Sequence, residues 1–202
     1  DGGGGHGAAG REGRSSSAPE GGGGRGACSL DALARESGSR VKLLSQPGLG
    51  VAAARNRGIE ESRGEVPAFL DDDAQASPDW LENLLRCLEE TGAAGAGGPA
   101  LPEWEKEPGW IFRTEKALSY MGAFSLGAER RRLEGPRDFL IGANCAFRRE
   151  VFERGLRFRP PAWGGRDAFE DADFSRRMAA AFPVYYEPSA MVRHRIPARK
   201  LS

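Results

Sequence analysis

After residue 40, short apolar runs of strand length alternate with segments whose apolar residues have helical spacing. This pattern predicts strands and helices in turn. Residues 41–44 and 66–70 are compact apolar runs of strand length, whereas residues 51–59 carry apolar and small side chains at helical spacing. Ser77-Pro78-Asp79 is typical of a helix start, and Gly92 of a helix end. The helix between them has one apolar face, formed by Trp80, Leu81, Leu84, Leu85 and Leu88. Alternating strands and helices indicate an α/β sheet.

The second half of the chain has a less regular pattern. Residues 101–137 mix aromatic and charged side chains without a clear period, and we interpret them as a variable substrate region. The further elements that the pattern predicts are strands at 93–98, 139–147, 184–186 and 191–194, a helical turn at 149–154 and a helix at 169–181.

Residues 1–28 are rich in Gly and Ser and contain almost nothing apolar to bury. This composition predicts a flexible segment. The segment contains Gly-x-Gly patterns, but no predicted strand precedes them, so they do not indicate a phosphate-binding loop. We expect order to begin with a short helix near Leu30 and Leu33. Residues 29–202 should then form one partial domain with a sizeable core.

Composition excludes several classes of protein. Lys plus Arg and Asp plus Glu each number 29, so no excess positive charge attracts nucleic acid or anionic lipid. No apolar run approaches the roughly 20 residues that a membrane-spanning helix needs. Cys28, Cys87 and Cys145 are far apart and form no CxxC pair, which argues against a zinc ribbon or a disulfide framework. We expect no nucleic-acid partner, no membrane span in this chain, and a reducing location in the cytoplasm or at the inner face of the membrane.

The strongest chemical feature is the run Asp71-Asp72-Asp73, which follows the predicted strand 66–70. Adjacent carboxylates repel one another unless solvent or a cation neutralises them, so one interpretation is a divalent cation site. The other is a solvated turn in which the aspartates cap the end of the strand. A calcium-binding loop fits less well, because the run lacks alternating oxygen ligands.

Three further groups have a structural as well as a chemical explanation. Glu170 and Asp171 begin a predicted helix, where carboxylates also interact favourably with the helix dipole. His194 ends a short predicted strand, and a single histidine is more often a surface or packing residue than a ligand. Arg55 and Asn56 fit a solvated helix face as well as a binding surface.

Taken in order, these motifs resemble the pattern of the family 2 glycosyltransferases of the GT-A class, from about residue 41 to residue 201. The first half consists of Gly48-Leu49-Gly50, Ala54-Arg55-Asn56-Arg57-Gly58-Ile59, Gly64-Glu65, Ala68-Phe69-Leu70-Asp71-Asp72-Asp73 and Pro78-Asp79-Trp80-Leu81. The second half consists of Ile141-Gly142-Ala143-Asn144-Cys145-Ala146-Phe147-Arg148-Arg149, Phe169-Glu170-Asp171-Ala172-Asp173-Phe174 with Arg177, Tyr186-Glu187-Pro188 and Val192-Arg193-His194. The ordered set is specific, because such motifs seldom occur together by chance.

The resemblance implies a fold and a reaction. The fold is α/β: a GT-A Rossmann-like mixed sheet flanked by helices. The reaction transfers a sugar, with inversion at the anomeric carbon, from a nucleoside diphosphate sugar to a hydroxyl group of a carbohydrate or lipid-linked acceptor. Its product belongs to a cell-surface polysaccharide or glycolipid. A divalent cation, Mn²⁺ or Mg²⁺, stabilises the negative charge that develops on the departing diphosphate.

The resemblance also implies roles for residues. Asp171, or as second choice Glu170, accepts the proton of the acceptor hydroxyl group. Asp73 and His194 hold the cation. The residues that contact the nucleotide sugar are Arg55, Asn56, Asp71, Asp72, Gly142, Ala143 and Asn144. These roles require the aspartate triplet and the Glu-Asp pair to face one cleft.

The chain departs from the family pattern at its start. The family domain opens with a strand, a helix and a second strand, and none of these is visible in the sequence, so we expect a sheet that is incomplete at the N-terminus. Without those elements the sheet exposes an edge and contacts to the nucleotide base are missing. The alternative function is therefore a catalytically silent fragment or a sugar-nucleotide-binding module.

Overall fold

The computed structural model describes residues 41–135, 138–160 and 169–201. The chain separates into two units, Asp1–Ser45 and Gln46–Ser202, and the helices and strands of the described residues all lie in the second unit. The predicted flexible segment 1–28, its boundary at residue 29 and the predicted helix near Leu30 lie outside the described residues and stay predictions.

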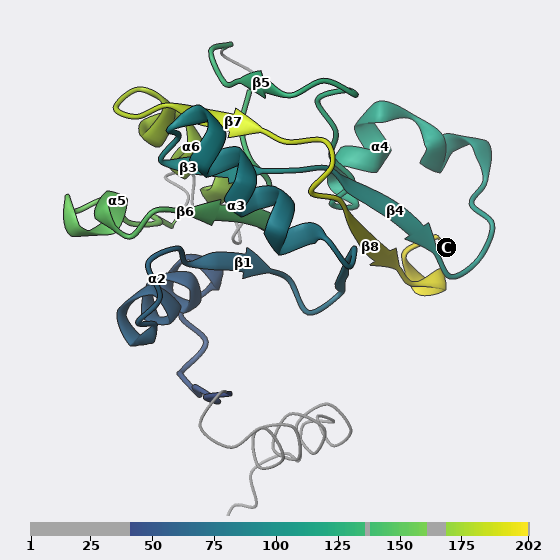
Figure 1. Cartoon of the computed structure of the whole chain (residues 1–202). Helices are drawn as coiled ribbons and strands as arrows, with labels where there is room; N and C mark the ends of the chain where they lie inside the picture. Colours follow the sequence, from purple (N-terminus) through teal and green to yellow (C-terminus); the bar gives the residue numbers. More distant parts are fainter. Residues whose placement is uncertain (1–40, 136–137, 161–168, 202) are drawn as a thin grey trace, which may run out of the picture. The chain divides into compact units, whose positions relative to one another are not determined.

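Five short strands of the second unit form a mixed sheet (Figure 1). They lie in the order β1 (Ala68–Leu70), β6 (Asn144–Phe147), β3 (Gly95–Gly97), β7 (Val184–Tyr186) and β5 (Arg131–Arg132). β3 and β7 are parallel, whereas the other neighbouring pairs are antiparallel. β1 forms one edge of this sheet, and its outer side has no strand partner among the described residues.

A second, three-stranded sheet consists of β2 (Ala74–Ala76), β8 (Val192–Ile196) and β4 (Ala100–Trp104). β8 is the central strand, and it pairs antiparallel with β2 and parallel with β4. The chain passes from β1 of the first sheet to β2 of the second across Asp71, Asp72 and Asp73. The aspartate triplet therefore lies at the junction between the two sheets.

Helices cover both faces of the five-stranded sheet. α3 (Trp80–Thr91) lies in front of it in Figure 1, and α6 (Glu170–Ala179) lies behind it. The other helical segments of the described residues are α2 (Val51–Glu61), α4 (Glu115–Tyr120), α5 (Glu150–Glu153), η2 (Trp110–Arg113) and η3 (Ala198–Leu201). No helix in this part of the chain has both the length and the apolar character needed to cross a bilayer. Two mixed sheets flanked by helices confirm the predicted α/β fold class.

Alternate residues of the central strands pack against different helices. Ala96 and Ala146 belong to the buried cluster formed with the apolar face of α3. Cys145 and Phe147 belong to the cluster formed with α6, where the rings of Phe147 and Phe174 meet edge to face with centroids 5.1 Å apart. Because successive strand residues point to opposite faces, small alanines let α3 approach closely while large aromatic side chains fill the space under α6.

Most of the predicted elements are present with shorter or shifted bounds. The strands predicted at 66–70, 93–98, 184–186 and 191–194 are confirmed as β1, β3, β7 and β8. The predicted helices correspond to α2, α3 and α6, and the helical turn to α5. Gly92 ends α3 in the left-handed conformation, with φ of 64°.

Two strand predictions need correction. Residues 41–44 are not assigned to a strand in the described structure, and Leu43 is 49% exposed. An apolar run alone does not define a strand, because a strand also needs hydrogen bonds to a neighbouring strand. The strand predicted at 139–147 begins only at Asn144, whose N–H is used in a turn to the carbonyl oxygen of Ile141. β2 and β4 were not predicted, since their pairing with the distant β8 defines them.

The closest backbone approach among the described glycines occurs at Gly98, between β3 and β4. A Cβ atom there would lie 1.9 Å from the carbonyl oxygen of Ala190. We expect Gly98→Ala to lower the free energy of unfolding by about 3 kcal/mol or more, because backbone must move to accommodate the methyl group.

Gly58→Ala is the matched control for this substitution. Gly58 lies inside α2 with open space at its Cβ position, so alanine should raise the free energy of unfolding by about 1 kcal/mol. Urea denaturation of both variants measures the difference. Equal stabilities would contradict the steric account of Gly98.

Candidate active site

The aspartate triplet forms the turn between β1 and β2, and the ladder between β2 and β8 brings a histidine to it. Ala74, the first residue of β2, lies opposite His194 of β8. His194 Nε2 lies 2.9 Å from Asp73 Oδ1. The histidine is 6% exposed, and its Nδ1 has no hydrogen-bond partner among the described residues. The sheet register therefore sets this carboxylate–imidazole contact.

Asp71, Asp73 and His194 together offer a possible set of metal ligands. One ligand atom from each residue lies within 4.8 Å of the others. Two carboxylates and an imidazole form an oxygen and nitrogen donor set that suits Mn²⁺, and also Mg²⁺ with additional water ligands. A cation would also offset the repulsion between the carboxylates. These residues fit the divalent cation that the family resemblance implies, with Asp71 joining the predicted pair of Asp73 and His194.

The second acidic group lies at the start of α6. The preceding residue, Phe169, has a left-handed backbone with φ of 76°, which is rare for a bulky side chain. Glu170 and Asp171 follow in the first helical turn, where the helix dipole favours carboxylates. Asp171 Oδ2 accepts a hydrogen bond of 2.9 Å from the N–H of Gly142. This bond holds the Asp171 carboxylate against the loop that precedes β6.

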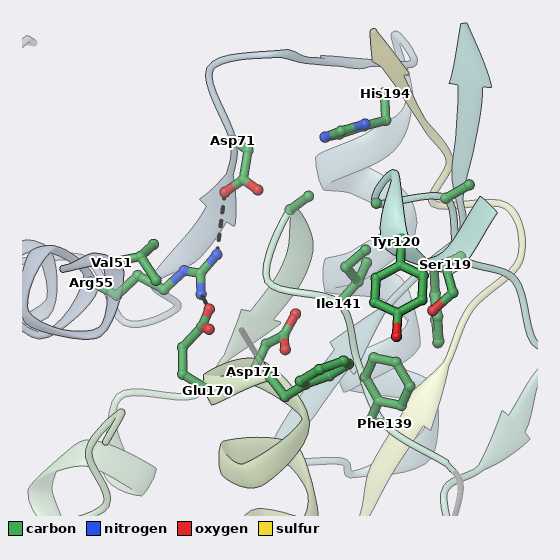
Figure 2. Close-up of a pocket in the computed structure, with 15 residues that line it drawn as sticks. Val51, Arg55, Asp71, Ser119, Tyr120, Phe139, Ile141, Glu170, Asp171 and His194 are labelled. Atoms are coloured by element: carbon green, nitrogen blue, oxygen red, sulfur yellow. Dashed lines mark hydrogen bonds and ion pairs between the residues drawn. The ribbon is translucent and has the colours of Figure 1, made fainter. Parts of the chain in front are cut away.

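A mostly buried arginine joins the two acidic groups (Figure 2). The Arg55 guanidinium extends from α2 and donates to Glu170 Oε1 and, at 3.3 Å, to Asp71 Oδ1. Its central carbon lies 5.5 Å from the centroid of the Phe158 ring. A Cβ atom at Gly142 would lie 2.2 Å from the guanidinium. Any other residue at this position would therefore displace the guanidinium from its present place between the carboxylates.

Glu170 and Asp171 are neighbours in different surroundings. Burial first, and the charge of Asp171 second, raise the pKa of the Glu170 carboxyl above its ordinary value despite the ion pair with Arg55. Asp171 is half-buried and forms no ion pair with a described residue. Because no direct ion pair with a described residue covers the Asp171 carboxylate, an entering hydroxyl group can approach it without displacing a guanidinium.

Asp71 of the triplet lines one cavity of about 390 Å³ together with Glu170 and Asp171, whereas Asp73 is absent from its lining. Figure 2 shows Arg55 between Asp71 and Glu170 on one side of this cavity, with Tyr120 and Phe139 on the side away from Arg55. The side formed by Arg55, Asp71 and Glu170 is thus charged and carries one of the possible cation ligands, Asp71. The other side is aromatic. His194 lies above the cavity, toward Tyr120 (Figure 2).

The remaining residues predicted to contact the nucleotide sugar occupy different positions. Ala143 lines the cavity, and Gly142 lies beneath the guanidinium. Asp72 is exposed in the turn and is absent from the cavity lining. The Asn56 amide donates to the carbonyl oxygen of Phe158 and accepts from its N–H, both at 2.9 Å. The Asn56 side chain therefore ties α2 to the backbone of a distant loop.

The aromatic side of the cavity was not predicted residue by residue. Ser119, Tyr120 and Phe124 line it, and the sequence marks them only as part of the variable substrate region 101–137. Phe139 lies on the same side, and Phe169 also lines the cavity. No local signal predicts the left-handed backbone of Phe169, because glycine or asparagine is the usual residue in that conformation.

A family model described as glycosyl transferase family 2 matches residues 29–156, more than half of the chain. The chain therefore belongs to glycosyl transferase family 2. It is 30% identical over 176 residues to the succinoglycan biosynthesis protein ExoM of Rhizobium meliloti, covering 86% of this chain and 53% of that protein. It is 33% identical over 104 residues to a glucosyl-dolichyl phosphate glucuronosyltransferase of Haloferax volcanii, covering 51% of this chain and 32% of that protein. The matched part of the chain thus spans about half or less of these relatives.

We expect Asn144→Ala to reduce stability rather than nucleotide binding. The Asn144 side chain is fully buried, and its Oδ1 accepts a hydrogen bond of 2.7 Å from Trp80 Nε1. Its Nδ2 donates to the carbonyl oxygens of Pro99 and Ala190 at 2.9 and 2.7 Å. Alanine leaves these groups unpaired, so the free energy of unfolding should fall by about 3 kcal/mol in thermal denaturation. Weaker UDP binding at unchanged stability would instead support the predicted contact of Asn144 with the donor.

Proposed function

We propose that this chain carries the catalytic site of an inverting glycosyltransferase. Its donor is a nucleoside diphosphate sugar, and its acceptor is a hydroxyl group of a carbohydrate or lipid-linked molecule. One observation carries the proposal: Asp71 and His194 line the same cavity as Glu170 and Asp171. Membership of glycosyl transferase family 2 supports sugar transfer as the chemistry of this cavity.

Asp171 acts as the general base in this proposal. The acceptor oxygen attacks the anomeric carbon, and its proton passes to the Asp171 carboxylate. The bond between that carbon and the diphosphate oxygen breaks on the opposite face, which inverts the configuration. Gly142 orients the carboxylate through its N–H. Glu170 is the second choice, because its carboxylate is already paired with Arg55.

The charged side of the cavity is the proposed donor side. Asp71, Asp73 and His194 would hold a divalent cation, Mn²⁺ or Mg²⁺, which as a bound Lewis acid stabilises the charge on the departing diphosphate. Arg55 holds Asp71 in place, and the exposed Asp72 is available to the ribose of the nucleotide. In this proposal Arg55 and Asp72 keep the association with the nucleotide that the sequence predicted for them.

Two further parts of the proposal concern the product and the compartment. One relative is named for succinoglycan biosynthesis and another as a glucosyl-dolichyl phosphate glucuronosyltransferase, which supports a cell-surface polysaccharide or glycolipid as the product. Cys87 and Cys145 are buried free thiols, which supports a reducing compartment, the cytoplasm.

Asp171→Asn should remove catalysis while preserving nucleotide binding. An amide cannot accept the proton, so we expect release of UDP from UDP-glucose in the presence of Mn²⁺, measured by a coupled assay, to fall by about 100-fold or more. UDP affinity measured by calorimetry should change little. Asp173→Asn is the control, since Asp173 lies on the same helix but is exposed and pairs with Arg177. Undiminished turnover by Asp171→Asn would remove Asp171 as the base.

Asp73→Ala should abolish the Mn²⁺ dependence of UDP binding, because one carboxylate ligand and the partner of His194 Nε2 are lost together. Calorimetric titration of UDP with and without Mn²⁺ measures this response, and Asp72→Ala should retain it. An unchanged response in Asp73→Ala would contradict the metal assignment. The unsubstituted chain could bind UDP in a metal-dependent way but turn over neither UDP-glucose, GDP-mannose nor any donor of a broader panel. That result would favour the sugar-nucleotide-binding module.

A further inference from the structure

A second cavity, of about 550 Å³, lies beside the candidate active site. The two cavities share Ser119, Ala123, Phe124 and Phe139 as lining residues. The second cavity therefore adjoins the aromatic side of the first and not the side that carries Arg55 and Asp71. The four shared residues lie between the two spaces, so a ligand with one part in each cavity would contact these residues.

Three of the four charged and hydroxyl side chains of the second cavity are engaged with other protein groups, and the fourth, Ser119, has no side-chain hydrogen bond to a described residue. Ser125 Oγ lies 3.2 Å from the hydroxyl oxygen of Tyr186. Asp138 pairs with Arg131 and accepts the N–H groups of residues 134 and 135. Arg113 pairs with Glu107. The cavity thus offers few uncommitted hydrogen-bonding groups to a ligand.

The rest of the lining is mainly hydrophobic. Leu101 on β4, Leu118 on α4 and Leu126 contribute aliphatic surface, and Leu101 is 39% exposed. Phe124 and Phe139 contribute two rings with centroids 4.7 Å apart. Such a surface gains free energy by covering hydrocarbon, whereas a sugar ring placed there would lose hydrogen bonds to water without replacement.

We propose that the second cavity binds the hydrocarbon part of a lipid-linked acceptor, while the acceptor hydroxyl group lies beside Asp171 in the first cavity. This inference rests on the proposed glycosyl transfer, and it narrows the acceptor from a carbohydrate or lipid-linked molecule to a lipid-linked one. The order across the site is then the donor and cation at Asp71, the base at Asp171 and the lipid beyond Phe139.

The test compares two probes that share a sugar and differ in their aglycone, octyl β-D-glucoside below its critical micelle concentration and methyl β-D-glucoside. Titrations of the 202-residue chain with labelled leucine methyl groups, followed by NMR, give the dissociation constants. We expect the octyl probe to bind at least about tenfold more tightly, because several methylene groups become buried. The methyl signals of Leu101, Leu118 and Leu126 should shift with the octyl probe.

Leu101→Asp is the decisive variant, since Leu101 lines the second cavity, is absent from the lining of the first and is partly exposed. It should reduce the octyl affinity to the level of the methyl probe. Leu81→Asp is the matched control: Leu81 is 46% exposed on α3 and lines neither cavity. Leu81→Asp should keep the octyl preference, and both variants should keep Mn²⁺-dependent UDP binding and an unchanged thermal transition.

The outcomes separate this inference from the proposed function. Equal affinities for the two probes, or an octyl preference that survives Leu101→Asp, would overturn the lipid assignment, and UDP-glucose turnover would still support transfer. If no donor or nucleotide binds or turns over, the proposed function fails, and the assignment of the cavity to an acceptor fails with it. If the unsubstituted chain turns over a donor and binds the octyl probe tightly, and if Leu101→Asp but not Leu81→Asp removes that binding, the results support both the lipid assignment and the proposed function.

Discussion

The candidate active site depends on the ion pairs of one mostly buried arginine. Arg55 joins Asp71, 16 residues away, to Glu170, 115 residues away. A buried guanidinium is strongly unfavourable unless carboxylates compensate its charge, and the same holds for buried Glu170 without Arg55. The helix α2, the turn after β1 and the start of α6 are therefore held to one arrangement. The glycine at position 142 belongs to that arrangement, because any side chain there would occupy the space of the guanidinium.

Within the metal-ligand group, Asp71 depends on its ion pair with Arg55, whereas the contact between Asp73 and His194 depends on strand register. Because Ala74 pairs with His194, the histidine side chain lies beside the turn that carries Asp73. A shift of β8 by one residue relative to β2 would turn His194 to the other face of the sheet. The three-stranded sheet thus positions the histidine, and the five-stranded sheet positions the aspartates. Ligands of α/β sheets commonly lie at such strand ends, where loops from several strands meet.

The sequence predicted the elements and residues that carry strong local signals. The helix α3 and the aspartates after β1 both follow from residue type and spacing, and both are where they were expected. The predicted apolar face of α3 needs one correction, because Leu81 is 46% exposed whereas Cys87 is buried. β2, with the sequence Ala-Gln-Ala, has no such signal, since only its pairing with β8 makes it a strand. Residues 41–44 show the converse, because they have the composition of a strand but are not part of a strand in the described structure.

The site shows the same limit at the level of side chains. Motif position alone associated Asn144 with the donor, but its amide is bonded to Trp80 and to two carbonyl oxygens in the core. Residue type could not show this, because an asparagine serves a buried network and a ligand equally well. Asp71 was expected at the nucleotide, and the turn also brings it to Asp73 and His194. Such assignments require the three-dimensional distances.

The edge position of β1 has a consequence for the behaviour of the protein at high concentration. An open strand edge is a template for pairing with a second chain, but β1 has only three residues and follows Pro67, which has no N–H to donate. Asp71, Asp72 and Asp73 follow directly, and at neutral pH their charges repel an identical copy. The proposed donor-side carboxylates thus stand where like charge disfavours the addition of a second copy to the edge of the sheet.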